Sequence, residues 1–263
     1  MKPTHLFLIF ILLIHMACHN DQSIDLTIMT YNIKHGEGMD NVLDLKRSAT
    51  VIRNQSPDLC GLQEIDHYCT RTDSVDQTGY LAGETNMTGT FGKFMDYQGG
   101  QYGMATLSKL PLLSTTILKL PDGIAEPRSS IVHEVIIADR CTIAFANVHL
   151  DWIGSEAGSK SRLDQARTLS SFLDSLNLPT IITGDFNCTP DSPTMNYFAD
   201  QGYEFVEKGP DNLTFQGNQK SEIDHLIYRK SENAKFEVSS VRLLNEPDIS
   251  DHRPLVIGLK VIY

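Results

Sequence analysis

The sequence is poor in basic residues. Its 263 residues include 22 lysines and arginines against 33 aspartates and glutamates, which gives a formal net charge of −11. Tight binding of DNA requires lysines and arginines lined up on the phosphates, and an anionic surface repels a polyanion. Nucleic acid is therefore a disfavoured substrate, although a local basic patch would still permit its binding.

Several catalytic motifs are also missing. The chain has no G-x-S-x-G nucleophile elbow, no H-E-x-x-H zinc motif and no P-loop, so nothing supports a serine hydrolase, a zinc peptidase or a nucleotide-binding protein. Five cysteines occur without a C-x-x-C pair, which argues against a zinc site. Cys60 and Cys141 lie in apolar runs and are interpreted as small buried hydrophobes, although a disulfide involving these two, Cys69 or Cys188 stays open.

Long linkers, internal repeats and low-complexity segments are absent from the sequence. With 41% hydrophobic and 21% charged residues, the chain can bury a large core, and its length suits one α/β domain. We therefore expect a single domain over residues 22–263, preceded by an export signal over residues 1–17, and we expect a monomer.

The export signal is predicted from the first residues. Lys2 is followed by the apolar run LFLIFILLI, which is too short to cross a bilayer comfortably. A buried strand or helix is the alternative, but such a segment normally shows some polar periodicity. The next residues, HMAC, resemble a bacterial lipoprotein signal with cleavage after Ala17 and a lipid on Cys18, although His15 stands where that motif prefers leucine. The sequence thus predicts an exported protein that is periplasmic, secreted or anchored to a membrane through Cys18; loss of Lys2 with the signal takes the net charge to −12.

Hydrophobic patterning predicts many short strands and few helices. Residues 24–33 alternate as in a strand, whereas residues 42–58 repeat apolar side chains at helical spacing up to Ser56 and Pro57. A second helix is predicted over residues 161–176. Further strands are predicted at 59–65, 102–112, 129–138, 141–150, 178–187, 222–230 and 253–262. This pattern indicates two packed sheets with helices outside them.

Polar residues of the kinds that catalysis uses gather at the ends of these strands. Catalytic groups are often placed where a rigid scaffold meets a loop, since there they are exposed and held in position. Each one alone has an ordinary explanation, such as a turn amide, a solvated strand end or a cap, but the whole set is hard to explain in that way. His225 is assigned instead to the core or the surface. The set is Asn32, Glu64, His149, Asp151, Asp185, Asn187, Asp224, Asp251 and His252.

Seven motifs, in their order along the chain, resemble those of the endonuclease/exonuclease/phosphatase superfamily, which includes deoxyribonuclease I, apurinic endonucleases, neutral sphingomyelinases and inositol polyphosphate phosphatases. The motifs are TYNIKHG, PDLCGLQEID, YGMATLSKLPL, NVHLDW, ITGDFNCTPDSP, EIDHLIY and SDHRPLVI. The resemblance runs from about Leu26 to the C terminus. It implies an α/β fold: a four-layer α-β-β-α sandwich of two mainly antiparallel sheets, with the site at one end.

The resemblance also implies a metal-dependent reaction. Glu64 is expected to be the main ligand of a divalent cation, Mg²⁺ or alternatively Mn²⁺, with Asn32 beside it in the metal site to orient a metal-bound water or a carboxylate. Asp185 is expected to orient and deprotonate the attacking water, and Asn187 to donate to the phosphate or the nucleophile. The implied reaction is hydrolysis of a phosphate ester by in-line attack, without a covalent intermediate.

The remaining residues are expected to bind the phosphate. His252 and His149 would contact the phosphoryl oxygens as charge builds, with Asp251 holding His252 and raising its basicity. Asp224 would support the histidine or the metal shell, and Tyr102 would donate a hydrogen bond to the scissile phosphate.

Two further stretches bear on the substrate. Residues 34–45 and 71–86 resemble a bacterial group similar to the catalytic-like domain of GPI-anchor lipid remodelling proteins, which points to a lipid, sugar or inositol phosphodiester. Arg71 and Arg128 are the candidate phosphate-binding cations, although arginines more often form surface charges or structural ion pairs. A secreted nuclease is the main alternative. A non-catalytic binding lipoprotein is a weaker one, because the set of acid, base and histidine is complete.

Overall fold

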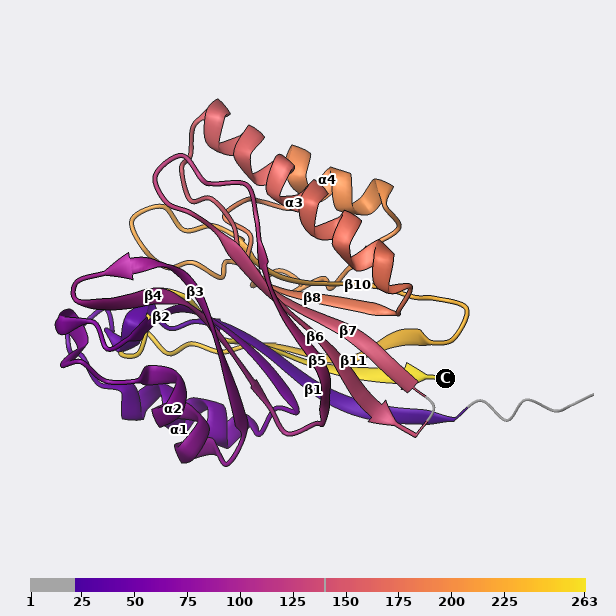
Figure 1. The fold of residues 1–263 in the computed structure, drawn as a ribbon, viewed down its shortest axis with the longest axis horizontal. Coiled ribbons are helices and arrows are strands. Elements are labelled where there is room, and N and C mark those ends of the chain that lie inside the picture. Colours follow the sequence, from indigo (N-terminus) through magenta and orange to yellow (C-terminus); the bar gives the residue numbers. More distant parts are fainter. Residues whose placement is uncertain (1–21, 140) are drawn as a thin grey trace, which may run out of the picture.

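The computed structural model describes residues 22–139 and 141–263, so the predicted export signal and Cys18 lie outside the described residues. Within those ranges, two six-stranded sheets pack face to face (Figure 1). The first sheet has the order β11-β12-β1-β2-β4-β3, and its strands are β1 (Ser23–Asn32), β2 (Leu59–His67), β3 (Thr88–Tyr97), β4 (Gly100–Ser108), β11 (Lys235–Leu243) and β12 (Leu255–Ile262). The second has the order β5-β6-β7-β8-β10-β9, and its strands are β5 (Leu112–Lys119), β6 (Ser129–Ala138), β7 (Cys141–His149), β8 (Thr180–Asp185), β9 (Glu204–Phe205) and β10 (Asp224–Arg229).

Helices cover the outer faces of both sheets (Figure 1). α1 (Leu45–Gln55) and α2 (Gln77–Thr85) pack on the first sheet, and α3 (Glu156–Leu176) and α4 (Pro193–Asp200) pack on the second. Each sheet contains one parallel pair, β1 with β2 and β7 with β8, and its other pairs are antiparallel. The predicted four-layer sandwich of mainly antiparallel sheets is thus confirmed. No helix in the described residues has the length and apolar character needed to span a bilayer.

Alternation along the strands divides the core into layers. In β1, Leu26 and Ile28 enter the core between the sheets, whereas Met29 and Tyr31 enter the core beneath α1 and α2. The same period of two operates in the second sheet, whose other face packs against α3 and α4. The cysteines of the described residues, Cys60, Cys69, Cys141 and Cys188, are free and buried, so Cys60 and Cys141 are the small buried side chains predicted for them.

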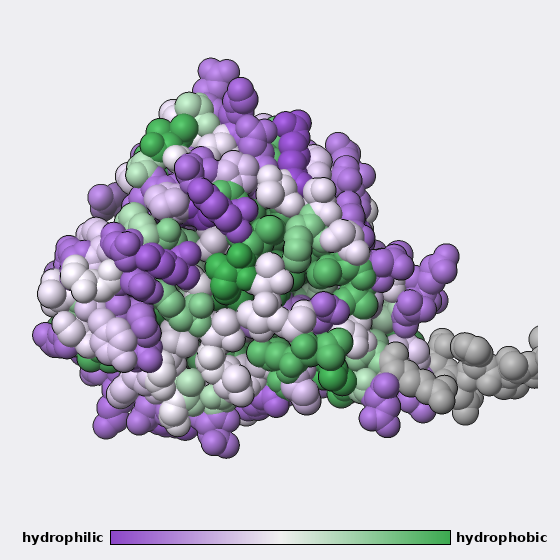
Figure 2. Space-filling model, in the orientation of Figure 1, coloured by the Kyte–Doolittle hydropathy of each residue, from purple (hydrophilic) through white to green (hydrophobic). Residues whose placement is uncertain are grey.

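The face seen in Figure 1 carries apolar residues in its middle, and hydrophilic residues surround them (Figure 2). β5 forms one edge of the second sheet, and its outward positions alternate between apolar Leu113 and Ile117 and polar Thr115 and Lys119. Interspersed polar and charged side chains of this kind protect a sheet edge against pairing with other chains.

A buried amide network joins the two sheets beneath the end that carries the predicted site. Asn147 of β7 donates from Nδ2 to the carbonyl oxygens of Leu62 (3.0 Å) and Ala105 (2.9 Å) in the first sheet. Its Oδ1 accepts a hydrogen bond from Nε2 of Gln63 at 2.7 Å. Because Asn147 is fully buried, these bonds fix how the strand ends of one sheet lie against those of the other.

We predict that Asn147→Ala lowers the free energy of unfolding by about 2–4 kcal/mol, since it removes three buried hydrogen bonds and leaves a gap between the sheets. Urea denaturation of the purified variant measures this loss. Asn54→Ala, at an exposed position of α1, is the control and is expected to stay within about 0.5 kcal/mol of wild type. Equal stabilities of the two variants would contradict the network's proposed role.

Candidate active site

The ends of several strands meet between the sheets, at the end of the sandwich away from the C terminus. β1 begins at Ser23 beside Ile262 and ends at Asn32 in the site. By the alternation of their strands, Asn32, His149 and Asp185 lie on the inter-sheet side, as the core residues four positions before them do. Asp224, at the start of antiparallel β10, is the register partner of Asp185. The scaffold therefore brings together residues that lie far apart in the chain.

Glu64 reaches this point through a β-bulge. Leu62 and Ile65 both point into the core beneath α1 and α2, although they are three residues apart. The register of β2 shifts between Gln63 and Ile65, and Glu64 has a left-handed φ of 58°. A bulge inserts one residue and re-aims a side chain, which here turns Glu64 from the helix side toward the site.

Gly184 allows β7 and β8 to approach each other closely. Its φ is +150°, and a Cβ atom there would lie 2.0 Å from the carbonyl oxygen of Val148. The next register pair is His149 with Asp185, whose Nε2 and Oδ2 atoms are 3.6 Å apart. The glycine of the TGDFN motif is thus required for the placement of the carboxylate that follows it.

Asn32 is the hub of the site. Its Nδ2 donates to Oε1 of Glu64 at 3.0 Å and to Oδ2 of Asp185 at 3.1 Å, and it lies 3.4 Å from Nε2 of His252. The backbone N–H of Lys34 donates to Asn32 Oδ1 at 3.0 Å, which fixes the orientation of the amide. Asn32 therefore orients two carboxylates, and its Oδ1, which accepts from Lys34, keeps a second lone pair toward the predicted metal site.

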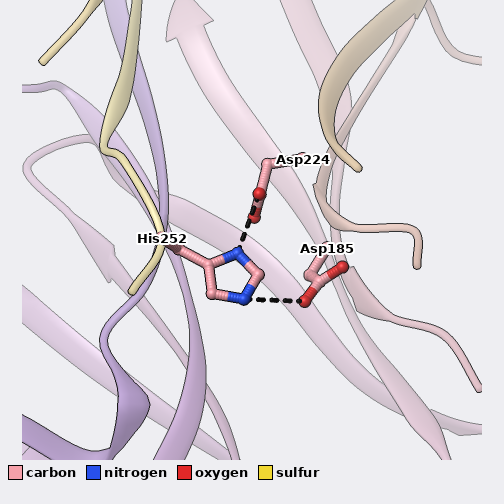
Figure 3. Close-up of side chains that lie close together, drawn as sticks. All are labelled: Asp185, Asp224 and His252. Carbon is pink, nitrogen blue, oxygen red and sulfur yellow. Dashed lines mark hydrogen bonds and ion pairs between the residues drawn. The ribbon is translucent and has the colours of Figure 1, made fainter. Parts of the chain in front are cut away.

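His252 lies between two buried carboxylates (Figure 3). Its Nδ1 is 2.9 Å from Oδ2 of Asp224, and its Nε2 is 3.7 Å from Oδ2 of Asp185. The expectation that Asp251 holds this ring is wrong, because the Asp251 carboxylate accepts from the Ser250 hydroxyl at 3.5 Å and lies 4.0 Å from Nζ of Lys34. Consecutive residues project in different directions, so the ring's partner comes from β10.

The charges of this group are strongly coupled. Burial alone would lower the pKa of His252, but the carboxylates of Asp224 and Asp185 outweigh it and raise that pKa to about 10. Burial, with the neighbouring Asp224, raises the pKa of Asp185 to about 7. For Asp224, burial opposes ionisation, yet the His252 imidazolium holds its pKa below the ordinary value. Near neutral pH the site therefore contains a charged His252–Asp224 pair and an Asp185 close to its titration point.

His149 differs from His252 in charge. Burial, the nearby guanidinium of Arg128 and the His252 imidazolium lower the pKa of His149 well below its ordinary value. Its ring is therefore neutral at physiological pH, and it can act on a phosphoryl oxygen only as a neutral hydrogen-bond donor.

A cavity of about 530 Å³ opens over these groups. It brings together every predicted site residue except Asn32, Asp224 and Asp151, and Asn32 and Asp224 lie behind its wall in contact with residues that border it. The lining residues that the sequence had singled out are Glu64, Arg71, Tyr102, Arg128, His149, Asp185, Asn187, Asp251 and His252.

The two predicted phosphate-binding arginines differ in how they are held. Arg71 donates two hydrogen bonds to the buried Asp66 carboxylate, at 2.7 and 2.8 Å, and its guanidinium stacks over the rings of Tyr97 and Tyr102. Arg128 is 2% exposed and lies 3.2 Å from the Glu126 carboxylate. Nη1 is the atom of this ion pair, although it makes no hydrogen bond of good geometry, and among the described residues Nε has no polar partner. A buried guanidinium with unused donors beside a cavity is well suited to bind an anion.

Asn187 and Asp151 have structural contacts of their own. The backbone N–H of Asn187 donates to Asp185 Oδ1 at 2.9 Å, and its Nδ2 donates to the Leu150 carbonyl at 3.0 Å. One of the two amide hydrogens of Asn187 is still available to a ligand. Asp151 is buried and accepts backbone N–H groups of Ile124 and Ile153, so it holds two loops together and does not border the cavity.

Among the polar or aromatic cavity residues to which sequence patterning assigns no role are Lys34, His35, Glu126 and Trp152. They lie in loops or in a single 3-10 turn, where no periodicity marks an inward-facing side chain. Lys34 and His35 have left-handed φ angles of 46° and 45°, and a pair of such residues is a local strain of the kind found at functional sites.

Glu64 is the carboxylate that best fits a divalent cation. It is half-buried, borders the cavity, and is held by one hydrogen bond from Asn32, so it retains lone pairs for a hard cation that also keeps its waters. Asp185, Asp224 and His252 also offer ligand atoms within 4.8 Å of one another. These atoms already serve one another, however, and a protonated imidazole cannot bind a metal.

The chain matches the family model described as Endonuclease/Exonuclease/phosphatase family over residues 29–252. Carbon catabolite repressor protein 4 homolog 3 of Arabidopsis thaliana is 25% identical over 171 residues, which are 62% of this chain and 36% of that longer protein. The match therefore spans about a third of that relative.

Solved structures show the same fold. An endonuclease/exonuclease/phosphatase from Beutenbergia cavernae has a TM-score of 0.76 at 22% identity, covering 90% of this chain and 72% of that one. A mannosyl-6-phosphatase from Bacteroides thetaiotaomicron has a TM-score of 0.66 at 21% identity, covering 89% and 99% of the two chains. Together with the family match over most of its length, the fold shows that this protein belongs to the endonuclease/exonuclease/phosphatase family of phosphoester hydrolases.

Proposed function

We propose that the protein hydrolyses a small or lipid-linked phosphodiester by in-line attack of a water molecule that Asp185 deprotonates. The observation that carries this proposal is the meeting of Glu64, Asp185 and His252 around the Asn32 amide, at the floor of one cavity. A divalent cation held by Glu64, Mg²⁺ or Mn²⁺, would neutralise charge on the phosphoryl oxygens.

Asp185 is suited to act as a general base. A base works best when its pKa lies near the working pH, and burial raises the pKa of Asp185 to about 7. Asn32 Nδ2 and the Asn187 backbone N–H hold one carboxylate oxygen each. The carboxylate therefore keeps one orientation while it receives the proton of the attacking water.

His252 is suited to stabilise the charge that develops on the phosphate. Asp224 holds Nδ1, so the proton on Nε2 points toward Asp185 and the cavity (Figure 3). An imidazolium fixed in this way can donate to a phosphoryl oxygen without reorganising during the reaction. Arg128, Tyr102 and, through its stacked guanidinium, Arg71 would bind the non-reacting oxygens.

The substrate is proposed to be a head group and not a nucleic acid. The net charge of −11 opposes binding of a polyanion, which keeps a secreted nuclease as the second candidate. An exported enzyme, anchored through a lipidated Cys18 if that signal is used, would meet lipid-linked phosphodiesters. The likeness in fold to a mannosyl-6-phosphatase is compatible with a small phosphorylated substrate.

The test compares hydrolysis of bis(p-nitrophenyl) phosphate and p-nitrophenyl phosphate, with Mg²⁺, with Mn²⁺ and with EDTA. Metal-dependent turnover of the diester is the expected result. Turnover of the monoester alone would replace the phosphodiesterase by a phosphatase, and preferential digestion of plasmid or single-stranded DNA would favour the nuclease.

We predict that Glu64→Gln weakens Mg²⁺ binding at least tenfold, because the neutral amide offers no negative charge to a hard cation. Isothermal titration calorimetry of the purified protein measures the affinity without any substrate. Glu237→Gln, at an exposed position of β11, makes the same chemical change away from the cavity and should bind Mg²⁺ as wild type does. Unchanged affinity in Glu64→Gln would place the cation elsewhere.

A further inference from the structure

The only tryptophan of the sequence, Trp152, borders the cavity. It follows Asp151 in the loop after β7, and it is 54% exposed. An exposed indole leaves a large flat apolar surface in water, which is unfavourable unless a ligand covers it. Trp152 is therefore the cavity residue whose exposure most needs an explanation.

The backbone on both sides of Trp152 is held rigidly. Buried Arg162 of α3 donates from Nη1 to the carbonyl oxygens of Asp151 (2.7 Å) and Ile153 (2.9 Å), and Gln165 Oε1 accepts the Asp151 N–H at 3.0 Å. The loop lies so close to α3 that a Cβ atom on Gly158 would come within 1.9 Å of the Ile153 carbonyl oxygen. A side chain exposed on a backbone that is fixed in this way is preorganised for contact.

The same anchor also holds a carboxylate at the cavity. Asp151 Oδ2 accepts the Ile124 N–H at 2.7 Å, and the Gly123 N–H donates to the Glu126 carbonyl at 2.8 Å. Glu126 lines the cavity together with Trp152, and its carboxylate is 3.2 Å from Arg128. One buried aspartate therefore fixes the two loops that present an aromatic face and an acceptor to the same space.

We propose that Trp152 and Glu126 form a subsite for a cyclic polyol, such as a hexose or an inositol, that is esterified to the phosphate. The C–H face of such a ring packs on the indole, and its hydroxyl groups donate to the Glu126 carboxylate. This inference rests on the proposed function, because the ring must be carried by a phosphate bound over Asp185 and His252. It adds to that function the part of the substrate that determines specificity.

Two other ligands would also contact an exposed indole. A membrane-inserted indole would gain from basic residues facing anionic lipid, yet the net charge is −11. A nucleobase would stack on the indole and donate N–H groups to Glu126, so binding of a nucleoside monophosphate is measured against binding of the polyol.

Calorimetric titration with myo-inositol 1-phosphate and with glycerol 3-phosphate, in the presence of Mg²⁺, tests the subsite. The two ligands share the phosphate and differ in the ring. Wild type is expected to bind the inositol phosphate about tenfold more tightly, and Trp152→Ala should lose that preference while Trp152→Phe keeps most of it. The preference should survive in Leu113→Ala, which removes a similarly exposed apolar side chain of β5 outside the cavity lining.

Fluorescence gives an independent reading, because all tryptophan emission comes from Trp152. The inositol phosphate should change the emission with saturation, at the affinity that calorimetry finds. Equal affinity of wild type for both ligands, an unchanged preference in Trp152→Ala, tighter binding of a nucleoside monophosphate, or an emission change with phosphatidylglycerol vesicles alone would each overturn the subsite. Because these titrations need no turnover, a failure of the proposed hydrolysis would be seen separately in the p-nitrophenyl assays.

Discussion

Asp185→Asn is expected to lower turnover of bis(p-nitrophenyl) phosphate by about 10²–10⁴-fold, the contribution typical of a positioned general base. The amide keeps the size of the carboxylate, and its single oxygen can still accept a hydrogen bond from one of the two donors, Asn32 Nδ2 or the Asn187 backbone N–H. It cannot take a proton from water. The loss should therefore appear in kcat, measured by p-nitrophenolate release with saturating Mg²⁺.

The same substitution should stabilise the metal-free fold above neutral pH. The folded pKa of Asp185, about 7, lies above its ordinary value, so the folded state retains a proton that the unfolded state releases. The stabilisation of the folded state by this retained proton is fully present below about pH 4 and is lost as the pH rises through about 7. With EDTA present, Asp185→Asn should match wild type near pH 4 and melt about 2–6 °C higher at pH 8.

Thermal unfolding of Asp200→Asn, at the exposed end of α4, supplies the matched control, since it removes an aspartate charge far from the site. It should retain wild-type kcat and show no comparable gain in Tm with pH. Full activity in Asp185→Asn would exclude Asp185 as the base. A destabilised but inactive variant would show instead that the carboxylate holds the strand ends together.

The sequence was sufficient to predict the inner strands, because their side chains alternate between two apolar layers. β1, β7 and β8 carry apolar residues on both faces, and these apolar runs predicted the strands themselves. α2 was missed because Gly79 and Gly83 weaken its helical signal. β11 was missed because it is largely exposed and polar and contains a register shift between Val238 and Ser240.

The site could be predicted as a set of residues but not as a set of contacts. Strand ends identified Asp224, Asp251 and His252, yet the partner of the imidazole depends on the register in which β10 pairs with β8, and that information is not local. The resemblance implied Asp251 as the residue that holds the ring, whereas Asp224 contacts Nδ1 in the structure. The loops that carry Glu126 and Trp152 show no hydrophobic periodicity. The sequence pattern therefore does not indicate that they form part of the cavity wall.

Asp224→Asn is the second substitution for which we expect a large effect, with turnover at pH 8 lowered by about 10²–10³-fold. The asparagine can still accept a hydrogen bond from His252 Nδ1, but it removes the negative charge that contributes most to raising the pKa of that ring to about 10. Burial then dominates and lowers the pKa of His252. At pH 8 the imidazole becomes neutral and offers the phosphate less stabilisation.

The pH dependence of kcat distinguishes this mechanism from a general loss of structure. In wild type, Asp185 must be unprotonated and His252 protonated, so activity should rise through about pH 7 and fall through about pH 10. In Asp224→Asn the alkaline limb of the profile, where activity falls, should move to a much lower pH. The acid limb, where activity rises, should also move to a lower pH, because Asp224 helps to raise the pKa of Asp185. The range of active pH values therefore shifts downward and narrows.

Asp251→Asn is the matched control, because Asp251 is adjacent to His252 in sequence but contributes less than Asp224 or Asp185 to its pKa. Its alkaline limb should stay close to that of wild type. A pH profile of Asp224→Asn that superimposes on that of wild type would contradict the pairing of His252 with Asp224. A large shift in Asp251→Asn alone would instead identify Asp251 as the residue that holds the ring. Titration of the His252 ring by NMR tests the same assignment without substrate, since Asp224→Asn should lower its pKa strongly and Asp251→Asn should lower it much less.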